Sequence, residues 1–157
     1  MRLKVAQDKA NFRQMITLDI PLLVSMEREI YPESPWSANQ FKEELAGMPK
    51  SREYLVALDE IEVVGYGGVA LLGDVADIHT LTIKQSHRRL GIASKMLEKL
   101  ETWAIERGAK ALMLEMREGN EAAMSLYQKA GYQLISRRDN YYAKGIHALI
   151  MRKEVEQ

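Results

Sequence analysis

Cysteine is absent from the 157-residue sequence, which excludes disulfides, a cysteine nucleophile and a thiolate metal site. An excess of charge is also absent, because 22 basic and 22 acidic side chains balance. This balance argues against broad electrostatic binding of nucleic acid. No apolar run approaches the roughly 20 residues that span a bilayer, and no signal-peptide core precedes the first charges. We therefore expect a cytoplasmic protein that binds neither nucleic acid nor membrane directly, and we predict no metal site.

The length predicts a single domain, in which the first ten residues either extend the first strand or form a loose extension. Hydrophobic periodicity predicts both strands and helices in the remainder. The predicted strands cover residues 12–16, 52–58, 61–71, 75–83, 110–116, 132–136 and 148–151. The predicted helices cover residues 17–30, 37–47, 90–107 and 120–130, and a basic, tyrosine-rich loop joins the last two strands.

This order of elements predicts an α/β (α+β) fold with a mixed sheet flanked by helices. The two strands that flank the helix at residues 90–107 are expected to pair with each other in parallel. Ligands of such sheets bind at the carboxyl ends of strands, where neighbouring strands diverge. Both of these strands end near the segment from Arg88 to Ala93, so we expect a ligand there.

The segment from Arg88 to Ala93 reads Arg-Arg-Leu-Gly-Ile-Ala and opens a long helical pattern. The N–H groups of a first helical turn have no intrahelical partner, and the helix dipole adds partial positive charge. Gly91 permits a close approach of the backbone, and Arg88 and Arg89 add permanent charge. These features favour phosphate binding. A solvated basic loop is the competing interpretation, since neither of the two better-known glycine-rich phosphate motifs is present.

A second group of candidate residues follows the strand at residues 110–116. Glu115 lies at the end of this apolar strand, where a carboxylate is either paired, for example with Arg117, or used in catalysis. Asn120 and Tyr127 are two helical turns apart and share one face with Ala123. Asn120 can also simply cap its helix, and Tyr127 can simply fill the core.

Two aromatic residues outside these groups have open roles. His79 lies on the strand at residues 75–83 and has a pKa range suited to proton abstraction, but a lone strand histidine is often only packed or hydrogen-bonded. Trp36 follows two prolines after the first helix. It is either a core aromatic or part of the wall of a substrate groove.

Arg88-x-x-Gly91-x-Ala93 resembles the Q/R-x-x-G-x-G/A signature of the GNAT acyltransferase superfamily. Arg88 and Ala93 stand where glutamine and glycine are frequent, and the signature allows both. Residues 112–132 resemble the L-x-L-E-[VM]-R-x-x-N-x-x-A-x-x-L-Y-x-x-x-G-[FY] pattern of the N-terminal protein acetyltransferases in that superfamily.

Two further segments resemble the branch that acetylates the N-terminal alanine of a small-subunit ribosomal protein. They are Pro35-Trp36-Ser37 and the Arg-Arg-x-x-Tyr-Tyr run at residues 137–142. The whole resemblance spans residues 12–153, and the first ten residues have no counterpart in it.

The resemblance implies the GNAT fold, with six to seven strands in a mostly antiparallel sheet, about four helices, and a splay between the fourth and fifth strands. It also implies acetyl-coenzyme A as the acyl donor. A backbone N–H near Leu81, Thr82 or Ile83 would polarise the thioester carbonyl. The other implied donor-binding residues are Arg88, Arg89, Leu90, Gly91, Ile92, Ala93, Asn120 and Tyr127.

The reaction implied is direct transfer of acetyl to a protein α-amino group within a ternary complex. An α-amino group has a pKa of about 8, against about 10.4 for lysine, so a modest base suffices. The resemblance makes Glu115 that base, through water, and Tyr127 the acid that protonates the leaving thiolate. Glu27, Trp36, Tyr141 and Tyr142 are the residues we expect to contact the peptide.

Two other functions stay open on the sequence. A GNAT enzyme acting on a small-molecule amine would share the same donor site. A non-catalytic domain that binds acetyl-coenzyme A would share the fold, although the presence of both Glu115 and Tyr127 argues against it.

Overall fold

The computed structural model describes residues 10–156, so the extension predicted over residues 1–10 lies almost wholly outside the described range. The described residues form one seven-stranded sheet in the order β1-β2-β3-β4-β5-β7-β6. The strands are β1 (Asn11–Gln14), β2 (Arg52–Asp59), β3 (Glu62–Leu72), β4 (Val75–Ile83), β5 (Ala111–Arg117), β6 (Gln133–Ala143) and β7 (Ile146–Glu154). The helices are α2 (Ile20–Ile30), α3 (Ala38–Ala46), α4 (Ile92–Glu106) and α5 (Glu121–Lys129), with 3-10 turns η1 (Thr17–Asp19) and η2 (Gln85–His87). These elements confirm the predicted fold class.

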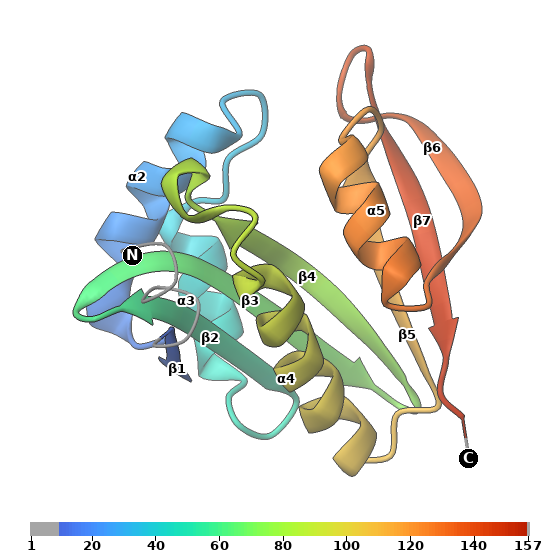
Figure 1. Cartoon of the computed structure of the whole chain (residues 1–157), viewed down its shortest axis with the longest axis horizontal. Helices are drawn as coiled ribbons and strands as arrows, with labels where there is room; N and C mark the ends of the chain where they lie inside the picture. The colour runs from blue at the N-terminus through green and yellow to red at the C-terminus, as the bar shows by residue number, and fades with distance from the viewer. Residues whose placement is uncertain (1–9, 157) are drawn as a thin grey trace.

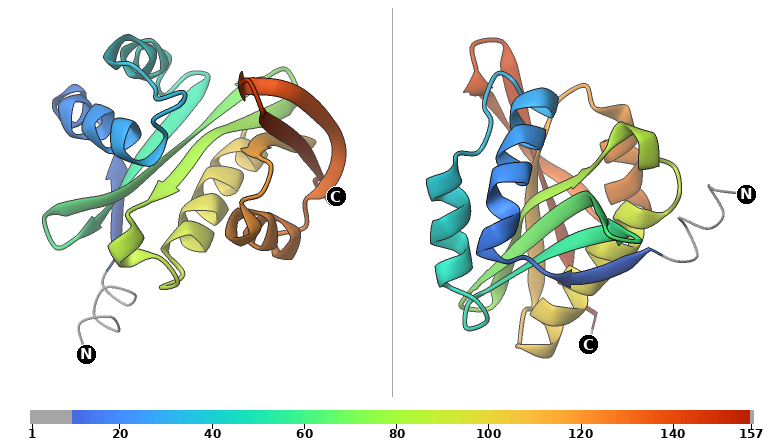
Figure 2. Two further views of the ribbon diagram at one scale, coloured as in Figure 1. Left: turned by 90° about the horizontal axis from the view of Figure 1, so that it is seen from above. Right: turned by 90° about the vertical axis from the view of Figure 1, so that its left-hand side faces the viewer.

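Helices cover both faces of the sheet: α2 and α3 lie on one face, and α4 and α5 lie on the other (Figure 1, Figure 2). Each layer has its own cluster of buried apolar side chains. On β2, Tyr54 and Val56 belong to the cluster with α2 and α3, whereas Leu55 and Ala57 belong to the cluster with α4. Side chains alternate between the faces of a strand, so a strand covered on both faces is apolar throughout.

The first two helices begin in different ways. Ser37 and Gln40 form a capping box at the start of α3, with reciprocal hydrogen bonds of 2.8 and 3.2 Å. Asp19 occupies the N-cap position of α2, but its side chain makes no hydrogen bond to that helix. Its carboxylate instead forms a paired contact of 2.8 Å with Arg13 and accepts the N–H of Ile16, so it fixes the turn before the helix. None of the helices in residues 10–156 combines the length and apolar character needed to cross a membrane.

The parallel strands β4 and β5 pair along only part of their length. Their last paired residues are Ile78 and Leu114. Beyond this point β4 continues to pair with β3 as far as Ile83, and β5 continues to pair with β7 as far as Arg117. The two halves of the sheet therefore separate between β4 and β5, and the gap opens toward the carboxyl ends of both strands (Figure 1). This is the predicted splay.

The last two strands are much longer than predicted. Residues 137–147 were expected to form a loop, but β6 extends to Ala143 and β7 begins at Ile146. The prediction failed because β6 is an exposed edge strand and lacks the alternation of apolar and polar residues that marks a half-buried one. Its pairing is also irregular between Arg138 and Ala143. Tyr141 and Tyr142 consequently lie on a strand.

The glycines of β3 allow neighbouring side chains to pack closely against the strand. A bulge lies between Gly68 and Val69 in the pairing with β4. A Cβ atom on Gly68 would lie 2.3 Å from the ring of Tyr54, and one on Gly67 would lie 2.7 Å from the sulfur of Met96. Such distances exclude any side chain unless the neighbouring groups move.

Replacing Gly68 with alanine should lower the free energy of unfolding by about 1–3 kcal/mol, because the added methyl group overpacks a buried site. Urea unfolding of the wild type and of Gly68→Ala measures this change. Gly47→Ala is the comparison, since its backbone φ of −89° suits alanine, and the added Cβ, 2.8 Å from Cγ of Arg52, would displace a partly exposed side chain and not a fully buried ring. We expect less than about 1 kcal/mol there, and equal effects of the two variants would contradict the packing argument.

Candidate active site

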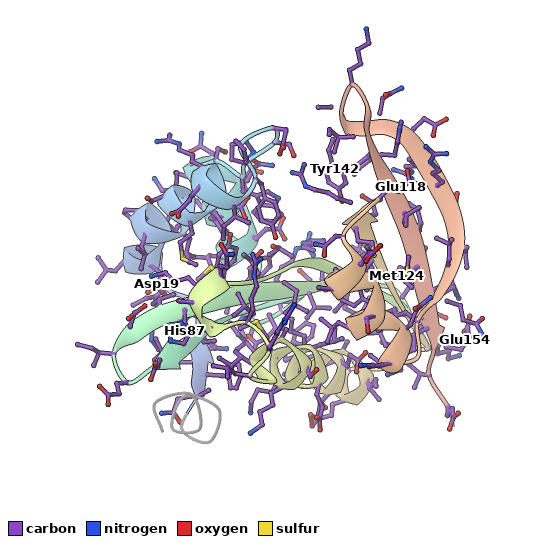
Figure 3. All side chains as sticks on the ribbon, turned by 45° about the horizontal axis from the view of Figure 1, so that its top comes forward. Asp19, His87, Glu118, Met124, Tyr142 and Glu154 are labelled. Carbon is purple, nitrogen blue, oxygen red and sulfur yellow. The ribbon has the colours of Figure 1, made fainter. Side chains whose placement is uncertain are left out.

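Two adjoining cavities of about 720 and 120 Å³ lie on the open part of the splay. Seven residues line both of them: Ser34, Trp36, Ile78, His79, Leu114, Glu115 and Tyr142. The larger cavity extends toward α3 and the smaller extends toward α5. Tyr142 lies on the side of the β6–β7 hairpin that faces α2 (Figure 3). The two cavities meet where β4 and β5 part, so a donor and an acceptor could approach each other from two sides.

The segment before α4 has the backbone of an anion-binding loop. Arg89 and Gly91 have φ angles of 64° and 81°, and Gly91 caps the helix. Within the described residues, the N–H groups of residues 89–94 have no hydrogen-bond acceptor, and the first bond of the helix runs from Lys95 to Gly91. A run of free N–H groups at a helix N-terminus fits a pyrophosphate group.

The side chains of this loop are anchored. Leu90 and Ile92 are buried in the core beside β4, so they can offer a ligand only their backbone. Arg88 donates its Nε–H to the carbonyl of Ile83, 3.1 Å away. In the turn just before it, His87 contacts the carboxylate of Asp59 at 2.8 Å. The loop is thus held by the ends of β2 and β4.

The predicted amides at residues 81–83 are not equivalent. Lys84 donates its N–H to Val64 of β3 at 2.8 Å. Hydrogen bonds alternate along an antiparallel pair, so the N–H of Thr82 also points toward β3, while those of Leu81 and Ile83 point toward the splay. Leu81 lines the smaller cavity. Its amide is therefore the one best directed to polarise a carbonyl group.

Glu115 is the first residue of β5 beyond the last pair with β4, and His79 is the first residue of β4 beyond it. The two residues lie on either side of the start of the splay, and both line both cavities. The carboxylate of Glu115 lies 3.5 Å from Arg138. It does not contact Arg117, which we had considered as its partner. The side chain of Glu115 is 33% exposed, so water can reach it.

Tyr127 and Asn120 share one side of α5, as predicted, and both line the smaller cavity. The ring of Tyr127 is buried against Tyr132, while its hydroxyl has no hydrogen-bond partner among the described residues. No buried side-chain oxygen there lacks a partner, so this hydroxyl must reach the cavity. Burial raises the pKa of Tyr127, with added effects from Tyr31 and Tyr142, and keeps it protonated. Asn120 does cap α5, through the N–H of Ala123 at 3.0 Å.

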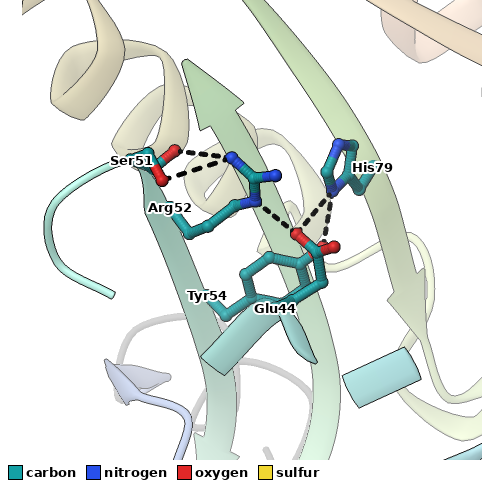
Figure 4. A network of polar contacts seen from close by, with 5 residues as sticks. All are labelled: Glu44, Ser51, Arg52, Tyr54 and His79. Atoms are coloured by element: carbon teal, nitrogen blue, oxygen red, sulfur yellow. Dashed lines mark hydrogen bonds and ion pairs between the residues drawn. The ribbon is translucent and has the colours of Figure 1, made fainter. Parts of the chain in front are cut away.

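His79 is held by a polar network on the opposite side of the splay (Figure 4). Its Nδ1 atom lies 2.7 Å from the hydroxyl of Tyr54 and 3.3 Å from Glu44, which also binds Arg52. Burial lowers the pKa of His79, so the ring is neutral at pH 7. With Nδ1 engaged, only Nε2 is available to a ligand.

The four predicted peptide-binding residues fall into two groups. Trp36, Tyr141 and Tyr142 all line the larger cavity. Trp36 also packs against Phe41, with ring centroids 5.1 Å apart, so it belongs to the core as well as to the cavity lining, and its contact with a substrate stays a prediction.

Glu27 differs from these three aromatic residues because it is only 2% exposed. It accepts hydrogen bonds from the hydroxyl of Tyr66 and, at 2.8 Å, from the N–H of Trp36. It lines the smaller cavity, not the larger one, and it supports the position of Trp36 through this hydrogen bond.

Sequence reasoning missed several residues of the site. Asp77 lines the larger cavity, and burial together with the charge of Glu115 raises its pKa. An acidic residue within an otherwise apolar strand was the signal that could have identified it. Tyr31 and Arg117 line the smaller cavity. Only their packing against each other, which the sequence does not reveal, brings them there.

The chain belongs to the acetyltransferase (GNAT) family, whose sequence model matches residues 20–132. It is an N-acetyltransferase, and the acyl donor of the family is acetyl-coenzyme A. The free N–H groups of residues 89–94 fit the pyrophosphate of that donor.

Several known proteins are similar to this chain. It is 33% identical over 144 residues to a putative [ribosomal protein bS18]-alanine N-acetyltransferase of Bacillus subtilis, covering 91% of this chain and 94% of the relative. It is 32% identical over 127 residues to N-alpha-acetyltransferase RimI of Mycobacterium tuberculosis, covering 78% and 77%. An uncharacterised protein of Mycobacterium leprae is 31% identical, and the chain spans 88% of its own length but only 39% of that longer protein.

Among solved structures, the ribosomal-protein-S18-alanine N-acetyltransferase of Escherichia coli superposes with a TM-score of 0.81, over 94% of this chain and 95% of that one. The sequence identity is 22%, so this likeness concerns the fold.

The buried carboxylate of Glu27 should make stability depend on pH. Burial raises its folded-state pKa above the ordinary 4.5, despite the opposing effects of Tyr66, Trp36 and Arg117. The folded state then binds the proton more tightly, and this stabilisation is lost as the pH rises above about 4.5 and through the folded-state pKa. As the pH rises above about 4.5, the free energy of unfolding of the wild type should fall relative to that of Glu27→Gln. Urea unfolding of both proteins at several pH values measures this difference. The exposed Glu29→Gln serves as control, and a difference for Glu27→Gln that is constant with pH would contradict this expectation.

Gly91→Ala should weaken the binding of free coenzyme A by at least about tenfold, or 1.4 kcal/mol. An L-residue resists the φ of 81° found there, and a Cβ would crowd the amides that face the phosphates. Isothermal titration calorimetry measures the affinity. Gly108→Ala is the matched control, because it lies beyond the other end of α4 with a φ of 101° and open space around it. Equal losses of affinity in the two variants would contradict the assignment of the loop.

Proposed function

We propose that the protein transfers acetyl from acetyl-coenzyme A to the N-terminal α-amino group of a protein, with the N-terminal alanine of a ribosomal protein as its substrate. The observation that carries this proposal is the juxtaposition of Glu115 with a wide aromatic-lined cavity on one side and Tyr127 on the other. The Bacillus subtilis relative, named as a putative [ribosomal protein bS18]-alanine N-acetyltransferase, supports this substrate, and the Mycobacterium tuberculosis relative, named as an N-alpha-acetyltransferase, supports an α-amino acceptor.

The acceptor amine must lose a proton before or during attack on the thioester. An α-amino group has a pKa of about 8, so about a tenth of it is already neutral at pH 7. Glu115 is accessible to water, so it can take the proton directly or through one water molecule. Its charge also favours the approach of an ammonium group.

The chain's remaining groups act on the two ends of the breaking bond. The N–H of Leu81 polarises the thioester carbonyl from β4. The protonated hydroxyl of Tyr127 donates its proton to the departing sulfur in the smaller cavity. Backbone amides of residues 89–94 hold the pyrophosphate, and the free amide group of Asn120 contacts the pantetheine arm. Transfer is direct, since the chain has no cysteine to carry the acetyl group.

The size of the larger cavity favours a peptide over a small amine. A free volume of about 720 Å³ bordered by Trp36, Tyr141 and Tyr142 can accommodate several residues beyond the reacting one.

Two peptides distinguish the candidate functions. One begins with alanine and follows the ribosomal substrate, and the other has the same sequence with a blocked N-terminus and an internal lysine. We expect thiol release from acetyl-coenzyme A with the first peptide alone. Turnover only with free small amines would instead support the alternative acceptor class, and coenzyme A binding without any turnover would indicate a non-catalytic domain.

Glu115→Gln should lower kcat/KM for the alanine peptide by about 100-fold at pH 7, because a general base contributes about 10²–10⁴-fold. The deficit should shrink above a pH of about 8, where the amine is neutral without help. Steady-state kinetics from pH 6.5 to 9.5 measures both effects. Glu118→Gln is the control, since that carboxylate pairs with Arg137 outside both cavities. Full turnover by Glu115→Gln together with a loss in His79→Ala would transfer the role of base to His79.

A further inference from the structure

A band of side chains closes the gap that the backbone leaves between β4 and β5. At one end, Thr82 of β4 contacts the hydroxyl of Tyr31 through its Oγ1 atom at 2.9 Å. The ring of Tyr31, at the end of α2, lies 5.1 Å from the guanidinium carbon of Arg117 on β5. That guanidinium lies 4.5 Å from the ring of Tyr142 on β6. We call these four residues the strap.

Arg117 is the central member of the strap because it contacts both aromatic rings. It also donates to Glu33 at 3.2 Å and to the hydroxyl of Ser34. Both of these residues belong to the segment between α2 and α3. The side chain of Arg117 is only 19% exposed, so it is held between these partners and does not extend freely into solvent. One residue of β5 thus joins β6 to the segment that carries Trp36.

We propose that Arg117 is a positioning residue that, as the centre of the strap, holds the segment at residues 31–36 in the place required for binding the acceptor. The residue lies two positions after Glu115 on β5. Any shift of the segment relative to Arg117 therefore changes the distance between the cavity wall and the proposed base. Arginine suits this task because a planar guanidinium can lie between two rings while its edge donates hydrogen bonds.

The segment has few other attachments. Within the described residues, its backbone donates three hydrogen bonds: from Tyr31 to the carbonyl of Glu27 at 2.8 Å, from Ser34 to Tyr31 at 3.1 Å, and from Trp36 to the carboxylate of Glu27 at 2.8 Å. The ring of Trp36 also packs against Phe41 at the far end of the segment. Its prolines at positions 32 and 35 have no N–H to donate. The contacts of Arg117 with Glu33 and Ser34 join the segment to β5, and through Tyr142 to β6. Without Arg117 the rings of Tyr31 and Tyr142 would lose the group that lies between them.

Amide hydrogen exchange tests the strap without any substrate. In Arg117→Met, which keeps a long apolar side chain but removes the planar charge, we expect the amides of Ser34 and Trp36 to exchange at least about ten times faster. Arg107→Met is the matched control. It removes another arginine 4.4 Å from an aromatic ring, that of Trp103 in α4, away from both cavities. Unchanged exchange at Ser34 and Trp36 in Arg117→Met would overturn the proposal.

Arg117→Lys separates the planar group from the charge. Lysine keeps the positive charge, but its ammonium group has no plane that can lie between two rings. It also cannot donate the paired hydrogen bonds that a guanidinium makes. We expect its exchange rates at Ser34 and Trp36 to lie between those of the wild type and Arg117→Met. Rates equal to the wild type would overturn the role assigned to the guanidinium plane.

A kinetic measurement tests the positioning role and rests on the proposed function. In Arg117→Met, KM for the alanine peptide should rise about tenfold, and KM for acetyl-coenzyme A should rise clearly less, because Arg117 lines the smaller cavity but the pyrophosphate is held by the backbone of residues 89–94. An equal rise in both KM values, together with a lower melting temperature, would show that Arg117 only stabilises the fold. That result would overturn the proposal. Absence of peptide turnover in the wild type would count against the proposed function, and hydrogen exchange would still decide on the strap.

Discussion

The early end of the pairing between β4 and β5 is the constraint on which the site depends. Two parallel strands that stayed paired to their ends would bury their backbone groups in the sheet and leave no opening. Here the last pair is Ile78 with Leu114. Beyond it, the backbone of β4 on the open side has no neighbouring strand. The free amide of Leu81 and the exposure of His79 and Glu115 to both cavities are direct consequences of this separation.

The elements around the opening hold the two halves of the sheet in place. The two halves stay rigid because each strand keeps its outer partner, β3 for β4 and β7 for β5. The open end is crossed by the strap, and the head of α4 is fixed by Arg88 and His87. The site therefore combines a paired sheet with two segments, residues 31–36 and the loop before α4, that are attached to the sheet through side-chain contacts. Such an arrangement can admit a donor and an acceptor from separate directions.

Local patterns in the sequence predicted most of the residues that are proposed to bind the donor, but only part of those that line the larger cavity. The basic turn with Gly91 before a helix, and the face shared by Asn120 and Tyr127, are short-range features, and the structure keeps them together. The larger cavity, which is proposed to bind the acceptor, is lined by the segment between α2 and α3 and by residues of α3, β4, β5, β6 and β7. Tyr141 and Tyr142 were assigned to a loop because an exposed edge strand carries no hydrophobic alternation.

The sequence by itself determined the order of the elements, the parallel crossover through α4, the loop at its head and the position of Glu115 at the end of a buried strand. Each follows from periodicity or from chain connectivity, which act over a few residues. Only the tertiary structure decided the partners of charged side chains: Arg138 for Glu115, Arg13 for Asp19, and the two rings around Arg117. These pairings join residues on different elements, so they depend on how the sheet twists and where it opens, which no local pattern records.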